Sequence, residues 1–220
     1  MQINKFVQKR YQHAIALHKM CAYLDTRSAY LILRTSAYPR VTFLQCVMHP
    51  RFLTNYLTDF DKKTDEIFLQ MVELPLTSNV GRLVNRFRCL PVFMGGLGIP
   101  SSLQLAPSSL VASVLSVSKR LKHYDPENHA HLLETTRGGK DPIGFCASYA
   151  RCIATSSWIR NANSRDADCL YHPCPAPPTE LPQTPTLALR SSDPPSMHDL
   201  SKNVHCMNWY SLLHDLKEDA

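Results

Sequence analysis

Apolar residues recur at helical spacing through most of residues 1–136, and this periodicity is what most constrains the fold. In residues 2–24, for example, Val7, Ala14, Leu17 and Cys21 follow such a spacing. Separations of three and four residues place side chains on one face of a helix. No stretch alternates apolar and polar residues as a half-buried strand does, and no repeat of 20–50 residues is present. The pattern predicts an all-α fold.

Prolines and capping residues divide this pattern into separate helices. Pro39 and Pro50 suit the first turn of a helix, where a missing N–H costs little. Asp25 or Thr26, and Asp125, suit the N-cap position. The β-branched residues after Pro39 also allow a strand, but we favour a helix there, and we expect Pro107 to restart the helix that contains it. The result is an irregular helical domain over 1–142, with helices expected over about 2–24, 26–37, 39–47, 50–72, 79–88, 101–122 and 126–136.

The second part of the chain is dominated by proline. Residues 173–195 hold 8 of the 16 prolines. Proline donates no backbone hydrogen bond and interrupts helices and central strands, so this segment is expected to be an extended, solvated linker. We expect a weak helix and loop over 143–172, the Pro-rich linker over 173–197, and a terminal amphipathic helix within 198–220. The tail is thus predicted to be largely disordered apart from its terminal helix.

The positive charge is unevenly distributed. Residues 1–142 hold 18 Lys and Arg against 10 Asp and Glu, whereas residues 143–220 hold 6 against 8. The first part therefore suits a polyanionic partner. No run of 18 apolar residues and no apolar run near Met1 is present, so we expect no membrane association and no secretion. The expected location is nuclear or cytoplasmic, with the 8 cysteines as reduced thiols.

Three closely spaced glycines mark a turn. Gly95, Gly96 and Gly98 match neither the spacing of a dinucleotide-binding loop nor that of a P-loop, and no lysine follows them. Glycines packed this closely indicate positive φ angles or a close backbone approach. We therefore predict a tight turn before the next helix.

Catalytic and metal-binding patterns are not evident. Asp59, Asp61, Asp65 and Glu66 share one helix at spacings that do not gather all four, so they are interpreted as a solvated helix face. No nucleophile motif or zincin motif is present, and we expect no enzyme activity and no cofactor. The weaker candidates for zinc are Cys169, His172 and Cys174, but their spacing, even together with His205 and Cys206, does not match a zinc site.

The best candidates for contacts with phosphate groups are basic residues on the later helices of the first part. Arg82 and Arg86 are four residues apart and share a helix face. The alternative is ordinary surface charge. The full set comprises Arg82, Arg86, Arg88, Lys119, Arg120 and Lys122.

Four segments, taken together, carry a family resemblance. They are Ala29–Arg34, Tyr38–Leu44, Asp59–Asp61, and Arg88–Ile99 with its Leu-Pro and Gly-Gly-Leu-Gly elements. Their order resembles the region just downstream of the catalytic core in reverse transcriptases of non-LTR retrotransposons, over about residues 20–118. The resemblance implies a thumb-like helical region that grips a primer–template duplex by its backbone. The matching residues are Arg40, Arg82, Arg86 and Arg88, with Gly95, Gly96 and Gly98 shaping the turn.

One departure from the family limits what the resemblance implies. The catalytic aspartates of the family lie upstream of the resembling region, so no polymerase activity is expected from this chain. The sequence therefore predicts a truncated or degenerate, non-catalytic remnant that binds RNA or an RNA–DNA duplex. The alternative is a helical protein–protein adaptor, in which Trp209 and Tyr210 within 198–220 dock a protein partner.

Overall fold

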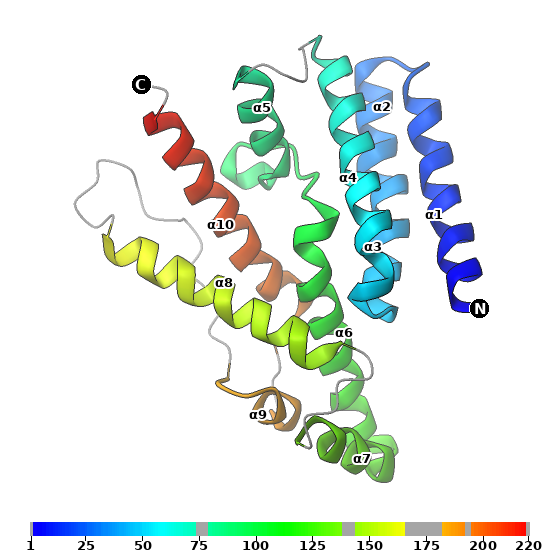
Figure 1. The fold of residues 1–220 in the computed structure, drawn as a ribbon, viewed down its shortest axis with the longest axis vertical. Helices are drawn as coiled ribbons and strands as arrows, with labels where there is room; N and C mark the ends of the chain where they lie inside the picture. The colour runs from blue at the N-terminus through cyan, green and yellow to red at the C-terminus, as the bar shows by residue number, and fades with distance from the viewer. Residues whose placement is uncertain (1, 74–78, 138–143, 166–181, 192–194, 219–220) are drawn as a thin grey trace. The chain divides into compact units, whose positions relative to one another are not determined.

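The fold is entirely helical over the residues that the structure describes. The computed structural model describes residues 2–73, 79–137, 144–165, 182–191 and 195–218, and no strand occurs among them. The predicted all-α class is therefore confirmed (Figure 1). In chain order the elements are α1 (Gln2–Cys21), α2 (Thr26–Ile32), the π-helical turn η1 (Leu33–Ala37), α3 (Tyr38–Val47), α4 (Pro50–Met71), α5 (Asn79–Cys89), the 3-10 turn η2 (Val92–Met94), α6 (Ser102–Tyr124), α7 (Pro126–Arg137), α8 (Phe145–Arg165), α9 (Pro185–Arg190) and α10 (Met197–Glu218).

The chain forms two compact units, and neither is a continuous stretch of sequence. Unit 1 consists of Met1–Leu44, Phe52–Gln104 and Asn208–Ala220. Unit 2 consists of Gln45–Arg51 and Leu105–Met207. This division differs from the expected one at residue 142, because the first part of the chain contributes to both units.

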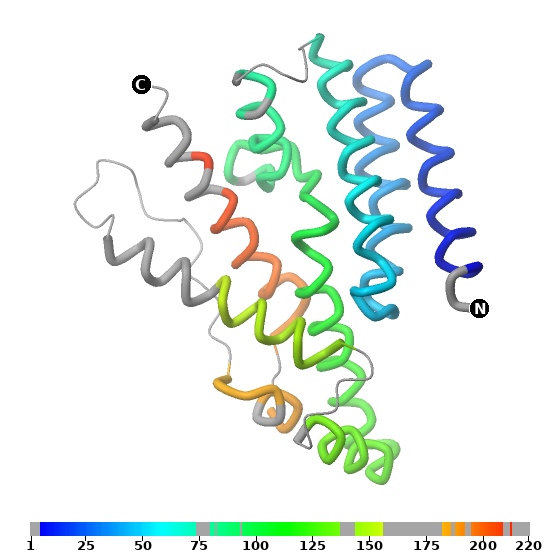
Figure 2. The backbone as a smooth tube through the Cα atoms, in the orientation of Figure 1, coloured from blue at the N-terminus to red at the C-terminus, as the bar shows by residue number. Residues whose placement is uncertain are grey.

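Pro39 lies inside a helix and does not begin one. α2, η1 and α3 follow one another without a break (Figure 2). The N–H of Tyr38 bonds to the carbonyl of Leu33, five residues back, so the helix widens by one residue just before Pro39. A π turn changes the local carbonyl positions where the proline ring would otherwise collide with the preceding turn. The helix favoured over 39–47 is confirmed, but the break expected after residue 37 is wrong.

Pro107 also lies within a helix. α6 runs through it from Ser102 to Tyr124, so the predicted restart at Pro107 is wrong. A proline in the second turn removes one backbone hydrogen bond. The residues around it are buried and pack the helix regardless, because tertiary packing supplies most of the stability of a helix in a protein. These buried neighbours include Leu105, Ala106, Leu110 and Val111.

Unit 1 is built around the packing of α1 against α2 and α4 (Figure 1). His18 of α1 is buried, with its ring edge on Phe60 of α4 at a centroid distance of 4.6 Å. Its Nε2 lies 2.9 Å from the hydroxyl oxygen of Thr64. The apolar side chains of this core include Val7, Ala14, Leu33, Leu53, Leu57 and Phe60.

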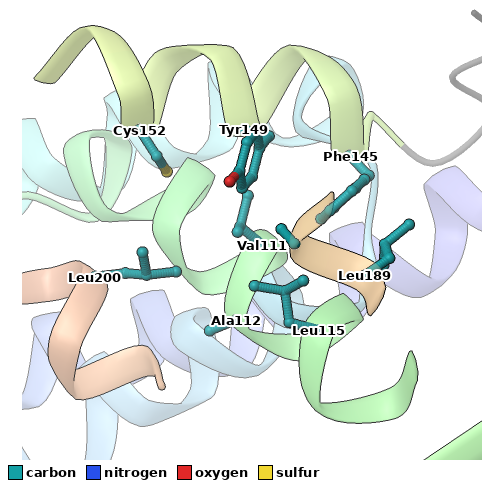
Figure 3. Close-up of a cluster of buried hydrophobic side chains, with 9 residues drawn as sticks. Val111, Ala112, Leu115, Phe145, Tyr149, Cys152, Leu189 and Leu200 are labelled. Atoms are coloured by element: carbon teal, nitrogen blue, oxygen red, sulfur yellow. The ribbon is translucent and has the colours of Figure 1, made fainter. Parts of the chain in front are cut away.

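Unit 2 has its own hydrophobic core, and α9 contributes to it (Figure 3). Ala188 and Leu189 of α9 are buried, and α9 contacts α7 and α8. The hydroxyl of Ser118 on α6 donates to the carbonyl of Leu189 at 3.2 Å. The other core residues are Val111, Ala112 and Leu115 of α6, Phe145, Tyr149 and Cys152 of α8, and Leu200 of α10.

Part of the Pro-rich segment is therefore not an extended linker. Pro185 occupies the first position of α9, where its fixed φ suits a helix, and a short run with buried Ala188 and Leu189 follows. The expectation of a solvated linker is wrong for Pro185–Arg190. Residues 173–181 and 192–194 of that expectation lie outside the described residues.

Several predicted helix ends agree with the structure. Asp25 caps α2, and Asp125 accepts a hydrogen bond from the N–H of Asn128 at 3.2 Å in front of α7. The terminal helix is present as α10, with Leu200, Val204 and Leu212 buried. The side chains of Trp209 and Tyr210 lie outside the described residues. α8 lies within the segment 143–172, where a weak helix and a loop were expected.

Candidate nucleic-acid interface

The formal net charge of the chain is concentrated in its first three helices. Residues 1–47 hold seven Lys and Arg against one Asp, and the remaining residues hold 17 basic against 17 acidic side chains. The whole net charge of +6 therefore belongs to residues 1–47. The single acid there, Asp25, lies between α1 and α2 as the cap of α2. Such a concentration produces a local positive potential that attracts anions.

α1 presents Lys5, Lys9 and Arg10 in two adjacent rows of exposed side chains. Lys5, Lys9 and His13 are spaced by four residues and share one helix face, and Phe6 and Arg10 form the neighbouring row. All five side chains are exposed. The guanidinium carbon of Arg10 lies 5.7 Å from the ring centroid of Phe6 and 5.9 Å from that of Phe43 on α3.

Two neighbouring cavities follow these rows. The first has a volume of about 440 Å³ and lies between α1 and α3, and the second has about 420 Å³ and lies along α1. His13 lines both of them. We call the surface formed by Lys5, Phe6, Lys9, Arg10, His13, Arg40 and Phe43 the basic face. The first cavity is lined by Arg10, His13, Pro39, Arg40 and Phe43, and the second by Lys5, Gln8, Lys9, Gln12 and His13.

Packing on the opposite side of α1 orients the basic face outward. Val7 and Ala14 are fully buried. The hydroxyl of Tyr11 donates to the carboxylate of Asp59 on α4, and the Tyr11 ring lies 5.0 Å from that of Tyr56. Because these contacts fix the rotation of α1, the rows that contain Lys9 and Arg10 face solvent.

The predicted phosphate-binding residues have different surroundings. Arg40 is exposed and lines the first cavity. Arg88 is 2% exposed, and its guanidinium donates to the carboxylate of Asp65 and to the carbonyl of Ile99 at 2.7 Å. Arg88 is therefore a structural cation that presents nothing to a phosphate at the surface. Arg86 on α5 is half-buried, and the side chain of Arg82 lies outside the described residues.

The remaining predicted cations belong to unit 2. Lys119, Arg120 and Lys122 are exposed on α6. Lys119 and Arg120 line a cavity of about 520 Å³, together with Ser113, Ser116 and Met197 among others. They do not join Arg40 in a single site within unit 1.

Of the four acidic residues of α4, Asp61 and Asp65 are engaged inside unit 1, whereas Glu66 is exposed as predicted. Asp61 accepts hydrogen bonds from the hydroxyl of Ser101 at 2.6 Å and from the N–H groups of Ser102 and Leu103 at 2.8 and 3.0 Å, and so caps α6. Asp65, one helical turn on, pairs with Arg88. The expectation of a solvated helix face is wrong for Asp61 and Asp65, because their carboxylates face the start of α6 and Arg88 of α5.

Asp61, Asp65 and Arg88 form a network of polar contacts, and its buried surroundings disfavour charge. Burial raises the pKa of Asp65, although the adjacent Arg88 guanidinium acts in the opposite direction. Burial, with the negative charge of Asp61 nearby, also raises the pKa of the Tyr38 phenol. The phenol oxygen lies near Ser102, Cys89 and Arg88. The network connects α3, α4, α5 and the start of α6, and these interactions are structural.

The glycine turn is as tight as its sequence predicts. Gly95 and Gly98 have φ angles of 83° and 67°, in the left-handed region that favours glycine. A Cβ on Gly96 would lie 2.2 Å from the carbonyl oxygen of Leu90. The N–H of Gly98 donates to the same oxygen at 2.7 Å. The predicted turn, with both positive φ and close backbone approach, is confirmed.

The turn is held against α2 by an aromatic side chain. The hydroxyl of Tyr30 donates to the carbonyl of Leu97 at 2.7 Å and accepts from Arg34 at 3.0 Å. The segments Ala29–Arg34, Asp59–Asp61 and Arg88–Ile99, which are separate in sequence, therefore lie within one unit.

The cysteines provide no metal centre in the described part of the chain. No group of three or more His, Cys, Asp or Glu side chains suited to a metal occurs among the described residues. Cys169, His172 and Cys174 lie outside them. Cys206 is disulfide-bonded, so the prediction of reduced thiols is wrong at that residue. Cys21, Cys46, Cys89, Cys146 and Cys152 are not joined in disulfides.

Among the described helices, none combines the length and apolar character that crossing a membrane requires. Comparison of the chain with protein-family models, with curated proteins and with solved structures finds no match.

Proposed function

We propose that this chain is a non-catalytic nucleic-acid-binding protein, a remnant of a retroelement reverse transcriptase, and that its basic face contacts the phosphate backbone of RNA or an RNA–DNA duplex. The observation that carries the proposal is the location of the whole net charge in residues 1–47, which contain α1 to α3. The resemblance to the thumb-like region of non-LTR retrotransposon proteins supports the same function. It rests on sequence segments that unit 1 brings together.

The physical basis is release of counterions from the nucleic acid. Each phosphate neutralised by a lysine or arginine releases condensed cations, which makes the affinity fall with salt concentration. Lys5, Lys9 and Arg10 are exposed, and α1 and α2 contain no acidic side chain that would compete with a phosphate. Contacts of this kind do not depend on base sequence.

The test is a fluorescence anisotropy titration of the full chain with a labelled RNA–DNA hybrid at several salt concentrations. The double variant Arg10→Gln/Arg40→Gln is expected to weaken binding at low salt and to reduce the salt slope by about 1.5, since each lost contact contributes about 0.7 to 0.9. The matched control is Lys62→Gln/Arg190→Gln, which removes two exposed cations that line neither cavity of the basic face. We expect the control to retain the original slope.

Two results would contradict the proposal. One is the absence of salt-dependent binding below about 10 μM at low salt, since this lies within the usual range of non-specific affinities. The other is equal weakening by the two double variants, which would mean that only the net charge matters and that the basic face is not the site.

The adaptor alternative has less support from the structure. α10 buries Leu200, Val204 and Cys206, and Leu200 belongs to the core of unit 2. The face of α10 that carries these residues is buried, so it is not available to a protein partner, and the side chains of Trp209 and Tyr210 lie outside the described residues.

A further inference from the structure

An exposed aromatic ring stands among the cations of the basic face. Phe43 is 49% exposed on α3 and lines the first cavity between Arg10 and Arg40. Phe6 of α1 is 42% exposed, and its ring centroid lies 5.7 Å from the guanidinium carbon of Arg10. Cations alone suffice to hold a phosphate backbone, so these rings are not explained by the proposed function.

We infer that the basic face binds single-stranded nucleic acid, with one unpaired base stacked on Phe43 in the cavity lined by Arg10 and Arg40. This inference rests on the proposed function and specifies its ligand. The flanking phosphates lie against the arginines, and the strand continues along α1 toward Lys9 and Lys5.

Stacking requires a base whose flat face is free. In a duplex both faces of each internal base are covered by neighbouring bases, whereas in a single strand a base can leave its neighbours and stack on a protein ring. The cavity of about 440 Å³ is within the size range of sites for small organic groups. It therefore has room for one base but none for a duplex.

Arg10 is already positioned beside the Phe43 ring. Its guanidinium carbon lies within 6 Å of the centroids of both Phe6 and Phe43. Cation–π contacts of this length hold the arginine beside the rings before a ligand arrives. The planar guanidinium binds phosphate through paired hydrogen bonds and also stacks on flat groups. One side chain thus serves both the base and the adjacent phosphate.

The position of His13 gives the direction of the bound strand. It lines both cavities, so a strand seated in the first continues into the second, which Lys5 and Lys9 line. Among the described residues that line the two cavities, none is acidic. The charge therefore favours a polyanionic strand over a cationic or neutral peptide.

The experiment compares three labelled probes with the full-length chain at low salt. They are an oligothymidylate of about 12 nucleotides, an abasic strand of equal length and charge, and a blunt RNA–DNA hybrid. Because base–aromatic stacking strengthens binding by roughly tenfold per base, we expect the oligothymidylate to bind about tenfold more tightly than the abasic strand. The hybrid is expected to bind no more tightly than the oligothymidylate.

Variants separate stacking from charge. Phe43→Leu should reduce the difference between the two strands to less than about threefold, mainly by weakening the binding of the oligothymidylate. Phe43→Tyr keeps the ring and should restore the difference. Phe87→Leu is the matched control, because Phe87 is 40% exposed on α5, away from the basic face. It should change neither affinity.

The outcomes distinguish this inference from the proposed function. Equal, salt-dependent binding of the thymidylate and abasic strands overturns the inference and leaves the proposed function standing. Tighter binding of the hybrid than of either single strand also overturns the inference and leaves the proposed function standing. The absence of salt-dependent binding to all three probes overturns both.

Discussion

His18 lies in a buried site that disfavours the charged imidazolium. It is 2% exposed, and its Nδ1 donates to the carbonyl of Ala14 at 3.2 Å. Burial lowers the pKa of His18 from 6.5 to about 4, and the positive charge of Lys63 acts in the same direction. The unfolded chain therefore takes up this proton at a higher pH than the folded chain does.

This difference predicts a loss of stability in mild acid. Between pH 6.5 and about 4 the unfolded state binds one more proton at residue 18 than the folded state does, so the free energy of unfolding falls as the pH falls. The expected slope from this residue approaches about 1.4 kcal/mol per pH unit. Urea unfolding at a series of pH values, with His18→Gln as the comparison, measures it. Identical slopes in the two proteins over this window would contradict the assignment.

At the residue scale, charge could be predicted from the sequence but burial could not. Arg88 has the composition and spacing of a surface cation, yet it lies inside because Asp65 and the carbonyl of Ile99, distant in sequence, receive its guanidinium. Arg40 remains exposed, as a phosphate-binding residue requires.

The α1 residues of the basic face were not assigned to a binding site from the sequence, although the sequence of α1 contains a signal for them. α1 contains four Lys and Arg and no acid, and Phe6 and Arg10 are four residues apart. An acid-free helix with a basic row attracts anions, and it is the signal from which the proposed basic face could have been predicted. Phe43 could not have been assigned to that site from sequence, since its place beside Arg10 depends on how α3 packs against α1.

Among the elements, the glycine turn requires a residue without a Cβ at position 96. Gly96→Ala would place a methyl group 2.2 Å from the carbonyl oxygen of Leu90, an atom of the backbone that cannot move independently. We expect a loss of about 3 kcal/mol in the free energy of unfolding, at the upper end for an overpacked site. Thermal or urea unfolding of the variant measures this change.

Gly95→Ala is the matched control within the same turn. A Cβ at Gly95 meets nothing within 4 Å, so only its positive φ of 83° opposes the change. The expected loss is about 1 kcal/mol. If the two variants lost equal stability, the close approach at Gly96 would not be what restricts the turn.

Helix starts were more predictable than helix ends and breaks. Asp25 and Asp125 cap helices through local hydrogen bonds, which the nearby sequence specifies. Pro39 and Pro107 did not break their helices, because in one case a π turn accommodates the ring and in the other buried neighbours hold the helix. α9 was missed because its stability comes from the burial of Ala188 and Leu189 against distant parts of unit 2.

For the molecule as a whole, the division into units predicts how a fragment will behave. Residues 1–142 contain Val111, Ala112 and Leu115, but Phe145, Tyr149 and Leu200, which complete their core, lie beyond that point (Figure 3). We expect the fragment 1–142 to expose this apolar surface. It should bind a hydrophobic dye and unfold less cooperatively than the full chain.

Calorimetry and dye fluorescence of the fragment and the full chain make the comparison. A fragment that unfolds in one sharp transition and binds no dye would mean that residues 1–142 are self-sufficient. The same reasoning applies to deletion of residues 173–220, which would remove Leu189 and Leu200 from unit 2 and so could not isolate a partner-binding role of the tail.

The interleaving of the two units also has a consequence for synthesis on the ribosome. Residues 1–44 and 52–104 emerge early, but the last segment of unit 1 begins at Asn208, after the whole of unit 2 has been translated. Unit 1 must therefore wait, incomplete, while 103 further residues are added. At typical rates of about 5–20 residues per second, that interval lasts roughly 5 to 20 seconds, during which chaperones have access to the nascent chain.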